Sequence, residues 1–436
     1  MLLFYLIVEL STVPVTVVVG SQWGDEGKGK IVDSLASKSS MVVRFQGGAN
    51  AGHTVYRGEK VYKFHLLPCS VLHKGVKSII ARGVALDLEL LLEEIKQIEN
   101  DNLDIDLVIS PQAFLVLPFH RWMDKLEELR RGQEKLGTTY RGIGPASTDR
   151  IARRGIRLGH LFEDNLLDRI KTLVGRVNAV LDGVYSDVTK RKINPQRLYE
   201  DLIKQRESIR KYVGDTHNLI HTAIENKEEV LMEGAQGSML DLGFGTYPYV
   251  TSSHTISGSA CVNAGLGPSQ ISQVLGIAKA YVTRVGAGPF PTKMNDEWNK
   301  KVQDKGKEFG ATTGRPRDCG WLDIPLLRYA HRLNGFTGVI LTKADILGGM
   351  GDIKVCTSWN WNGSEYKDVP EDSRVWDEGV PQYVTLEGWP DFSGIQKWNS
   401  LPEGLRKYCD FVESSSGVKI LAVSTGPGID DIAWKE

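Results

Sequence analysis

Short apolar runs that end at glycines or polar loops alternate with segments of helical period along the chain. The apolar runs, which we expect to be strands, are residues 17–19, 42–45, 107–110, 230–232, 278–285, 339–341, 353–356 and 420–423. Helical patterns cover residues 86–98, 121–131 and 322–333. This alternation predicts an α/β fold: a large, mostly parallel twisted sheet covered by helices, with P-loop-like nucleotide-binding loops and helical and small β subdomains.

The pattern offers no clear point at which to divide the chain, so residues 1–436 are expected to form a single domain. Apolar residues recur at helix spacing in a glycine-poor stretch, and roughly residues 100–213 are expected to form a mostly helical subdomain. Residues 1–12 are expected to be an N-terminal extension. Its apolar start is too short to span a bilayer, so an extra strand or an early start codon is expected rather than a signal peptide.

Charge and cysteine usage narrow the class of protein. The chain has 53 Lys and Arg residues against 54 Asp and Glu residues, so nothing indicates a nucleic-acid surface. Its 5 cysteines are scattered without a C-x-x-C pair, which favours reduced thiols in a cytoplasmic enzyme. His217 and His221 have the spacing of metal ligands on a helix. They lack the Glu of the zinc-protease motif and nearby cysteines, so they are expected to be polar surface residues.

The first candidate site is a glycine loop between a predicted strand and a predicted helix. Its sequence is Gly20-Ser21-Gln22-Trp23-Gly24-Asp25-Glu26-Gly27-Lys28-Gly29-Lys30. Backbone N–H groups in this context bind phosphates, although most glycine loops are only turns. Ile31 stands where an ordinary P-loop has the Ser or Thr that binds magnesium. A metal ion therefore needs another oxygen ligand, which Asp25 can supply, and the ionised carboxylate could also act as a base.

A second signal follows the predicted strand at residues 339–341. Thr342-Lys343-Ala344-Asp345 is short and common by chance, but an Asp in this position can accept hydrogen bonds from N1–H and the amino group of guanine. Together with the phosphate loop it indicates GTP.

Three further loops carry groups that can bind anions. Thr138 and Thr139 lie near Arg141, Arg150, Arg153 and Arg154, and this cluster is either a phosphate site or a solvated basic face. Arg315 and Arg317 follow Thr312-Thr313-Gly314, a combination that suits a carboxylate. His53 lies in a glycine loop, where it is either an acid that stabilises phosphoryl charge or a ring bonded to a carbonyl.

These loops together resemble the adenylosuccinate synthetase family. The resemblance runs in order through Gln22–Lys30, Gln46–Thr54, Gly137–Pro145, Glu233–Gly237, Gly245–Ser253, Thr283–Thr292, Thr312–Arg315 and Ser424–Pro427. It implies the Mg²⁺-dependent conversion of IMP, L-aspartate and GTP to adenylosuccinate, GDP and phosphate through 6-phosphoryl-IMP. It also implies a cytoplasmic homodimer in which Arg153 reaches the IMP phosphate of the neighbouring subunit.

The resemblance further implies a role for each matching residue. The catalytic set is Asp25, His53, Gln236 and Lys28, and the metal ligands are Asp25 and Gly52. GTP binding is expected at Asp25, Glu26, Gly27, Lys28, Gly29, Lys30, His53, Thr54, Arg317, Lys343, Asp345, Ser424, Thr425 and Gly426. IMP binding is expected at Asp25, Asn50, Thr138, Thr139, Arg153, Gln236, Leu240, Thr251, Val285 and Arg315. Aspartate binding is expected at Ala311, Thr312, Thr313, Gly314, Arg315 and Arg317.

Two alternatives stay open at this stage. Viral relatives of the family act on dGMP, and they typically have a small neutral residue in place of Asp25, so Asp25 favours IMP. A GTP-binding switch without ligase chemistry is the alternative of another class. It gives Thr138, Thr139 and Arg315 no ligand and Asp25 no role.

Overall fold

The computed structural model describes residues 15–58, 60–310 and 314–435. Within these residues, nine strands form one large sheet in the order β18-β17-β13-β10-β1-β9-β2-β5-β7. Their bounds are β1 Val15–Gly20, β2 Met41–Arg44, β5 Lys77–Ile80, β7 Leu107–Ile109, β9 Val230–Glu233, β10 Gln273–Lys279, β13 Gly338–Thr342, β17 Ile420–Ser424 and β18 Ile432–Trp434. Neighbouring strands run parallel except β17 and β18, which are antiparallel. The predicted α/β class is confirmed. The expected N-terminal extension, residues 1–12, lies outside the described residues.

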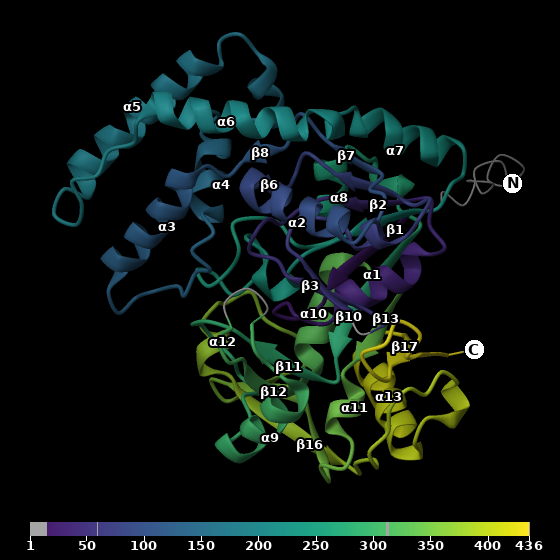
Figure 1. Ribbon diagram of the computed structural model, residues 1–436. Helices are drawn as coiled ribbons and strands as arrows, with labels where there is room; N and C mark the ends of the chain where they lie inside the picture. The colour runs from purple at the N-terminus through teal and green to yellow at the C-terminus, as the bar shows by residue number, and fades with distance from the viewer. Residues whose placement is uncertain (1–14, 59, 311–313, 436) are drawn as a thin grey trace, which may run out of the picture.

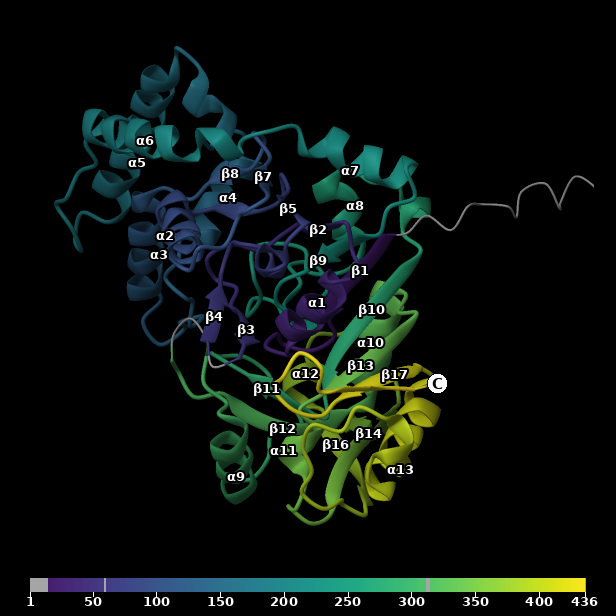
Figure 2. The ribbon, with the colours of Figure 1, turned by 45° about the vertical axis from the view of Figure 1, so that its right-hand side comes forward.

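Both faces of this sheet are buried. Along β1, Val17 and Val19 belong to one hydrophobic core, whereas Val18 between them belongs to the other. Side chains alternate between the two faces of a strand, so a continuous apolar run marks a strand covered on both sides. Figure 2 shows β10 between β1 and β13 near the middle of the sheet.

The helices occupy distinct regions around the sheet. Their bounds are α1 Lys28–Ala36, α2 Leu88–Asn100, α3 Pro118–Arg131, α4 Ile143–Ile151, α5 Leu166–Val184, α6 Pro195–Ile209, α7 Thr216–Glu225, α8 Gly258–Ala264, α9 Asp296–Gly306, α10 Ile324–Asn334, α11 Ala344–Leu347, α12 Val375–Glu378 and α13 Glu403–Ser416. Figure 1 shows α3 to α6 gathered at one end of the molecule, with α9 and α13 at the other. None of the described helices has the length and apolar character needed to span a membrane.

The strand predicted at residues 278–285 is divided in the structure. Residues up to Lys279 belong to β10 of the large sheet, and β11, Tyr281–Arg284, belongs to a smaller one. The Gln22 side-chain amide donates to the carbonyls of Lys279 and Tyr281, both at 3.2 Å, and the Ala280 N–H donates to the Thr342 carbonyl at 2.9 Å. The single strand predicted here is therefore two strands of different sheets, which meet at Ala280.

The smaller sheets complete the framework. β11, β12 (Asp318–Asp323), β14 (Ile353–Trp361), β15 (Ser364–Tyr366) and β16 (Val380–Leu386) form one of them. β3 (His53–Arg57) pairs with β4 (Lys60–Phe64), and β6 (Ala85–Leu86) pairs with β8 (Phe114–Leu115). The β3–β4 hairpin places His53 beside the phosphate loop.

Candidate active site

One cavity of about 2130 Å³ collects the predicted site residues. It lies at the carboxyl ends of β1, β2, β9, β13 and β17, where a parallel sheet binds its ligands. Of the predicted residues that the structure describes, all but Glu26, Arg153 and Thr425 line this cavity. Ala311, Thr312 and Thr313 lie outside the described residues.

The phosphate loop is held by a carboxylate that faces inward. The Glu26 side chain is fully buried and accepts from the backbone N–H groups of Gln22 at 3.0 Å and Gly24 at 2.9 Å. Its other oxygen lies 2.5 Å from the Lys28 ammonium. The Glu26 side chain therefore shapes the loop, which leaves only its backbone N–H for a phosphate. Gly27, at φ 88°, caps α1 in a left-handed conformation that costs glycine little.

Asp25 stands at the end of a row of alternating charges. Its Oδ2 lies 2.8 Å from Nε of Arg317, and Nη1 of Arg317 lies 2.5 Å from Oε2 of Glu308. Glu308 also accepts from the Lys279 ammonium at 2.9 Å and from the Tyr281 hydroxyl at 2.6 Å. Burial alone would raise the pKa of Glu308, but Lys279, Arg317 and Lys343 together lower it to about 2. The base of the predicted aspartate loop is thus anchored to Asp25.

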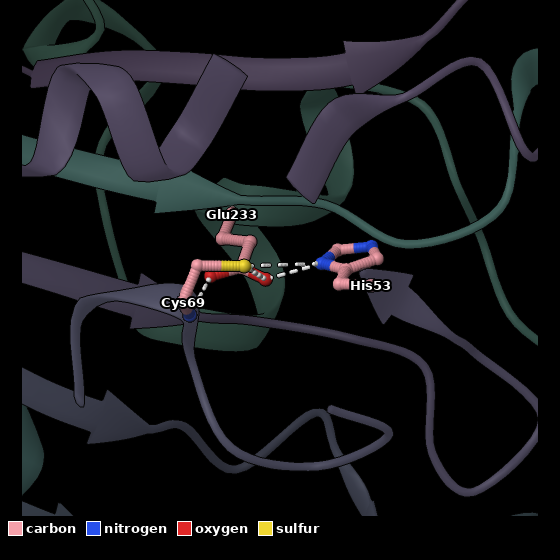
Figure 3. A group of neighbouring side chains, drawn as sticks. All are labelled: His53, Cys69 and Glu233. Atoms are coloured by element: carbon pink, nitrogen blue, oxygen red, sulfur yellow. Dashed lines mark hydrogen bonds and ion pairs between the residues drawn. The ribbon is translucent and has the colours of Figure 1, made fainter. Parts of the chain in front are cut away.

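His53 sits in a second buried group of charges (Figure 3). Its Nδ1 lies 2.5 Å from Oε1 of Glu233, and Arg44 Nη1 lies 3.0 Å from the same oxygen. Burial and Arg44 lower the pKa of His53 to about 4 despite the opposing effect of Glu233. Burial raises the pKa of Glu233, but His53 and Arg44 outweigh it and lower that pKa to about 2. His53 is therefore a neutral ring beside an ionised carboxylate at neutral pH.

Lys30 connects the phosphate loop to residues predicted to bind guanine. Lys30 of α1 donates to the Ser424 hydroxyl at 2.7 Å and to the carbonyls of Gly426 at 2.6 Å and Asp431 at 2.8 Å. Burial lowers the pKa of Lys30 to about 8. Burial also raises the pKa of Asp345, which lines the cavity at the start of α11. Thr425 points elsewhere, because its hydroxyl donates to the Ile395 carbonyl at 2.7 Å.

The predicted IMP side contains polar groups without a partner. Both side-chain polar atoms of Gln236 are buried against the cavity and have no hydrogen-bond partner among the described residues. Asn50 donates to the Thr251 hydroxyl at 3.1 Å, and its own Oδ1 has no such partner. Buried polar atoms are normally hydrogen-bonded, so these amides are suited to a polar ligand.

Loop residues form the opposite wall. Thr138 donates through its hydroxyl to Asp124 at 2.9 Å, and Arg315 donates to the Gly137 carbonyl at 2.9 Å. The exposed Arg153 lies outside the cavity. Among the described residues, nine non-glycine residues have positive φ, and four of them are predicted site residues: Asp25, Arg153, Gln236 and Lys343. Strained backbone of this kind gathers at functional sites.

Four charged residues of the site were missed by the sequence interpretation: Arg44, Glu233, Lys279 and Glu308. Three of them end apolar strands, and a charge at the end of a buried strand is a signal that could have identified them. The His217–His221 pair does not belong to the one group of three possible metal ligands found among the described residues. His221 instead contacts the Gly265 carbonyl at 3.0 Å. All five cysteines are free, as expected.

Comparison with known proteins decides the family. A family profile described as adenylosuccinate synthetase matches residues 17–433. An adenylosuccinate synthetase from Thermodesulfovibrio yellowstonii is 45% identical over 424 residues, which cover 96% of this chain and 98% of that protein. The chain belongs to the adenylosuccinate synthetase family. The predicted activity, that of an adenylosuccinate synthetase, is thereby confirmed, and the switch protein without ligase chemistry is excluded.

Two solved structures share the fold. The fully ligated adenylosuccinate synthetase from Plasmodium falciparum superposes with a TM-score of 0.90 at 35% identity, covering 97% of this chain and 100% of that one. A succinoaminodeoxyadenylate synthetase from cyanophage S-2L, solved with dGMP and dATP, gives a TM-score of 0.61 at 19% identity over 96% and 95% of the two chains. At 19% identity, the similarity to the phage enzyme shows only that the two chains share a fold.

Proposed function

We propose that the cavity joins L-aspartate to IMP at the expense of GTP, through 6-phosphoryl-IMP. Asp25 removes the N1 proton of IMP, so that O6 attacks the γ-phosphorus of GTP and GDP leaves. The aspartate amine then displaces phosphate from C6. The observation that carries this proposal is the convergence of Asp25, His53 and the unpartnered amide of Gln236 on one cavity. Phosphoryl transfer depends mainly on positioning and charge neutralisation, which this arrangement provides.

Asp25 and the Gly52 carbonyl would hold Mg²⁺. Both line the cavity, and hard oxygen donors are the ligands this ion prefers. The Asp25 side chain is 30% exposed, so its carboxylate is accessible to an ion that enters the cavity. The bound ion supplies charge neutralisation for the phosphates.

GTP is expected to lie along α1, with its phosphates at residues 27–30 and its base at Lys343 and Asp345. The Lys30 bonds to Ser424 and Gly426 support one continuous nucleotide site, because they tie the two ends together. The predicted aspartate loop follows Gly310, and its half-buried Arg315 lies at the mouth of the same cavity.

The working form is expected to be a cytoplasmic homodimer with composite IMP sites. Arg153 lies outside its own cavity and is exposed, as an arginine that serves a neighbouring subunit must be. Two large apolar side chains that line the cavity are exposed in the single chain: Ile151 at 80% and Val262 at 77%. Burial of such side chains between subunits would stabilise a dimer.

Side-by-side assays with IMP and dGMP test the proposed substrate. GTP consumption should require both L-aspartate and IMP, and it should produce adenylosuccinate and phosphate in equal amounts. Turnover of dGMP at the rate of IMP would contradict the proposal, as would GTP consumption that is independent of aspartate.

A further inference from the structure

A buried carboxylate that the proposed reaction does not use holds one of the loops predicted to bind IMP. Residues 132–142, which connect α3 to α4, form this loop. Glu128, near the end of α3, is 2% exposed. One of its oxygens accepts from the backbone N–H of Leu136 at 3.2 Å, and the other accepts from the N–H groups of Gly137 at 2.9 Å and Thr138 at 3.3 Å. Three consecutive N–H groups of the loop therefore converge on one carboxylate.

A second carboxylate of α3 holds the same loop further along. Asp124 lies one helical turn before Glu128, on the same face of the helix, and is 6% exposed. Its Oδ1 accepts from the Thr138 hydroxyl, and its Oδ2 accepts from the Gly142 N–H, both at 2.9 Å. The N–H and the hydroxyl of Thr138 both donate to α3. The loop is thus fixed on both sides of Thr139, which lines the cavity and is expected to bind IMP.

Direct contact with a ligand is a poor explanation for these two carboxylates. The phosphate of IMP is an anion, which a carboxylate beside it repels. Each of the four carboxylate oxygens already accepts from the loop, and this accounts for their burial without a bound cation. What Asp124 and Glu128 supply is therefore the conformation of the loop. The same loop contacts the predicted aspartate-binding residue Arg315, which donates to the Gly137 carbonyl at 2.9 Å.

We propose that Glu128 is a positioning residue of the IMP site: its carboxylate binds the N–H groups of residues 136–138 and holds Thr139 where it can donate to the phosphate of IMP. This inference rests on the proposed function, which brings IMP to this loop. A loop that is ordered before its ligand arrives loses less conformational entropy on binding. Glu128 therefore acts on the affinity for IMP. It does not act on phosphoryl transfer, because Asp25 and His53 lie on other elements.

Glu128→Gln keeps the length of the side chain but replaces one accepting oxygen with an amino group, which cannot accept from an N–H. We expect the KM for IMP to rise about 10-fold, with kcat and the KM for GTP within about 2-fold of the wild type. Glu128→Asp keeps the charge but is one CH₂ shorter, so it should raise the KM for IMP as well. An unchanged or lower KM for IMP in Glu128→Gln would overturn the inference, because the carboxylate would then do no more than repel the phosphate.

Glu94→Gln is the matched control. Glu94 of α2 is 4% exposed and accepts in the same pattern, from the N–H of His65 at 2.6 Å through one oxygen and from those of Leu66 at 3.2 Å and Leu67 at 2.9 Å through the other. Burial raises the pKa of Glu94 to about 7, so assays at about pH 8.5 keep it ionised and both substitutions remove one charge. Glu94→Gln should leave the KM for IMP within about 2-fold. An equal rise in both variants would overturn the specific role of Glu128.

Hydrogen–deuterium exchange of the ligand-free protein tests the contact without any substrate. The N–H groups of residues 136–138 should exchange slowly in the wild type although these residues are only half-buried, because all three are hydrogen-bonded. Glu128→Gln should speed their exchange about 10-fold and leave residues 65–67 unchanged, and Glu94→Gln should do the reverse. Fast exchange at residues 136–138 of the wild type would overturn the inference, whether or not a variant folds. A failure of the proposed function is recognised separately, by the absence of aspartate-dependent GTP consumption.

Discussion

The two walls of the cavity are built differently. Behind the inner wall, Glu26 with Lys28 and Glu233 with Arg44 form ion pairs whose side chains are at most 3% exposed. On the outer wall, Thr138 and Arg315 are half-buried on loops, and the exposed Arg153 lies beyond this wall, outside the cavity. Buried, paired charges are in place before a ligand arrives, whereas donors on loops can close on a ligand after it binds. We infer that the difference separates a wall suited to the chemistry from a wall suited to the recognition of IMP and aspartate.

Among the predicted variants, Asp25→Asn should cause the largest loss of activity. The amide cannot accept the N1 proton, so turnover should fall more than about 1,000-fold. The Asp25 side chain is 30% exposed and lies in the loop between β1 and α1, so the melting temperature should stay close to that of the wild type. Steady-state assays and thermal unfolding measure the two effects. Turnover near the wild-type value would refute the role of Asp25.

Glu308→Gln should show how much the row of charges stabilises the inner wall. The variant leaves buried Lys279 and Arg317 without their carboxylate, at a cost of about 3–5 kcal/mol in the free energy of unfolding. The folded-state pKa of Glu308 is depressed, so its contribution is present above pH 4.5 and is lost as pH falls toward 2.

Urea unfolding at pH 7 and at successively lower pH measures both effects of Glu308→Gln. The gap between wild type and variant should therefore shrink in acid. Glu297→Gln is the control, because its pair with Lys301 is exposed on α9 and its loss should be undetectable at pH 7. Equal losses in the two variants would show that the inner wall gains nothing from its buried charges.

Asp345→Asn should change which nucleotide is used without disturbing the chemistry. The carboxylate that accepts from guanine becomes an amide that complements xanthine, so the KM for GTP should rise about 100-fold and xanthosine triphosphate should become a substrate. Steady-state kinetics with both nucleotides measure the exchange. An unchanged preference would place the guanine contacts elsewhere.

Arg153→Ala tests whether the outer wall is completed by a second subunit. We expect kcat/KM for IMP to fall about 10-fold, because a charged contact to phosphate is lost. When these subunits are re-associated with Asp25→Asn subunits, about half of the dimers should be hybrids with one intact site each. Activity should then recover to about a quarter of the wild-type value. No recovery in verified hybrid dimers would mean that Arg153 does not act across an interface.

Part of the cavity lining could be predicted from the sequence because its signals are local. Asp25 lies within one glycine loop, and Lys343 and Asp345 directly follow one apolar strand, so the strand order alone brings them to one edge. Glu233 and Glu308 escaped prediction because their partners, Arg44 and Lys279, are distant along the chain. The sheet change at Ala280 was missed because residues typical of strands, Tyr281 and Val282, follow Lys279 after a single alanine.

The central claim is that Asp25 makes O6 of IMP the nucleophile toward GTP. IMP labelled with oxygen-18 at position 6 tests it most directly, with mass spectrometry of the released phosphate. The account predicts that each phosphate carries the label, because the oxygen leaves C6 bound to phosphorus. Phosphate without the label, formed at the same rate as adenylosuccinate, would contradict it.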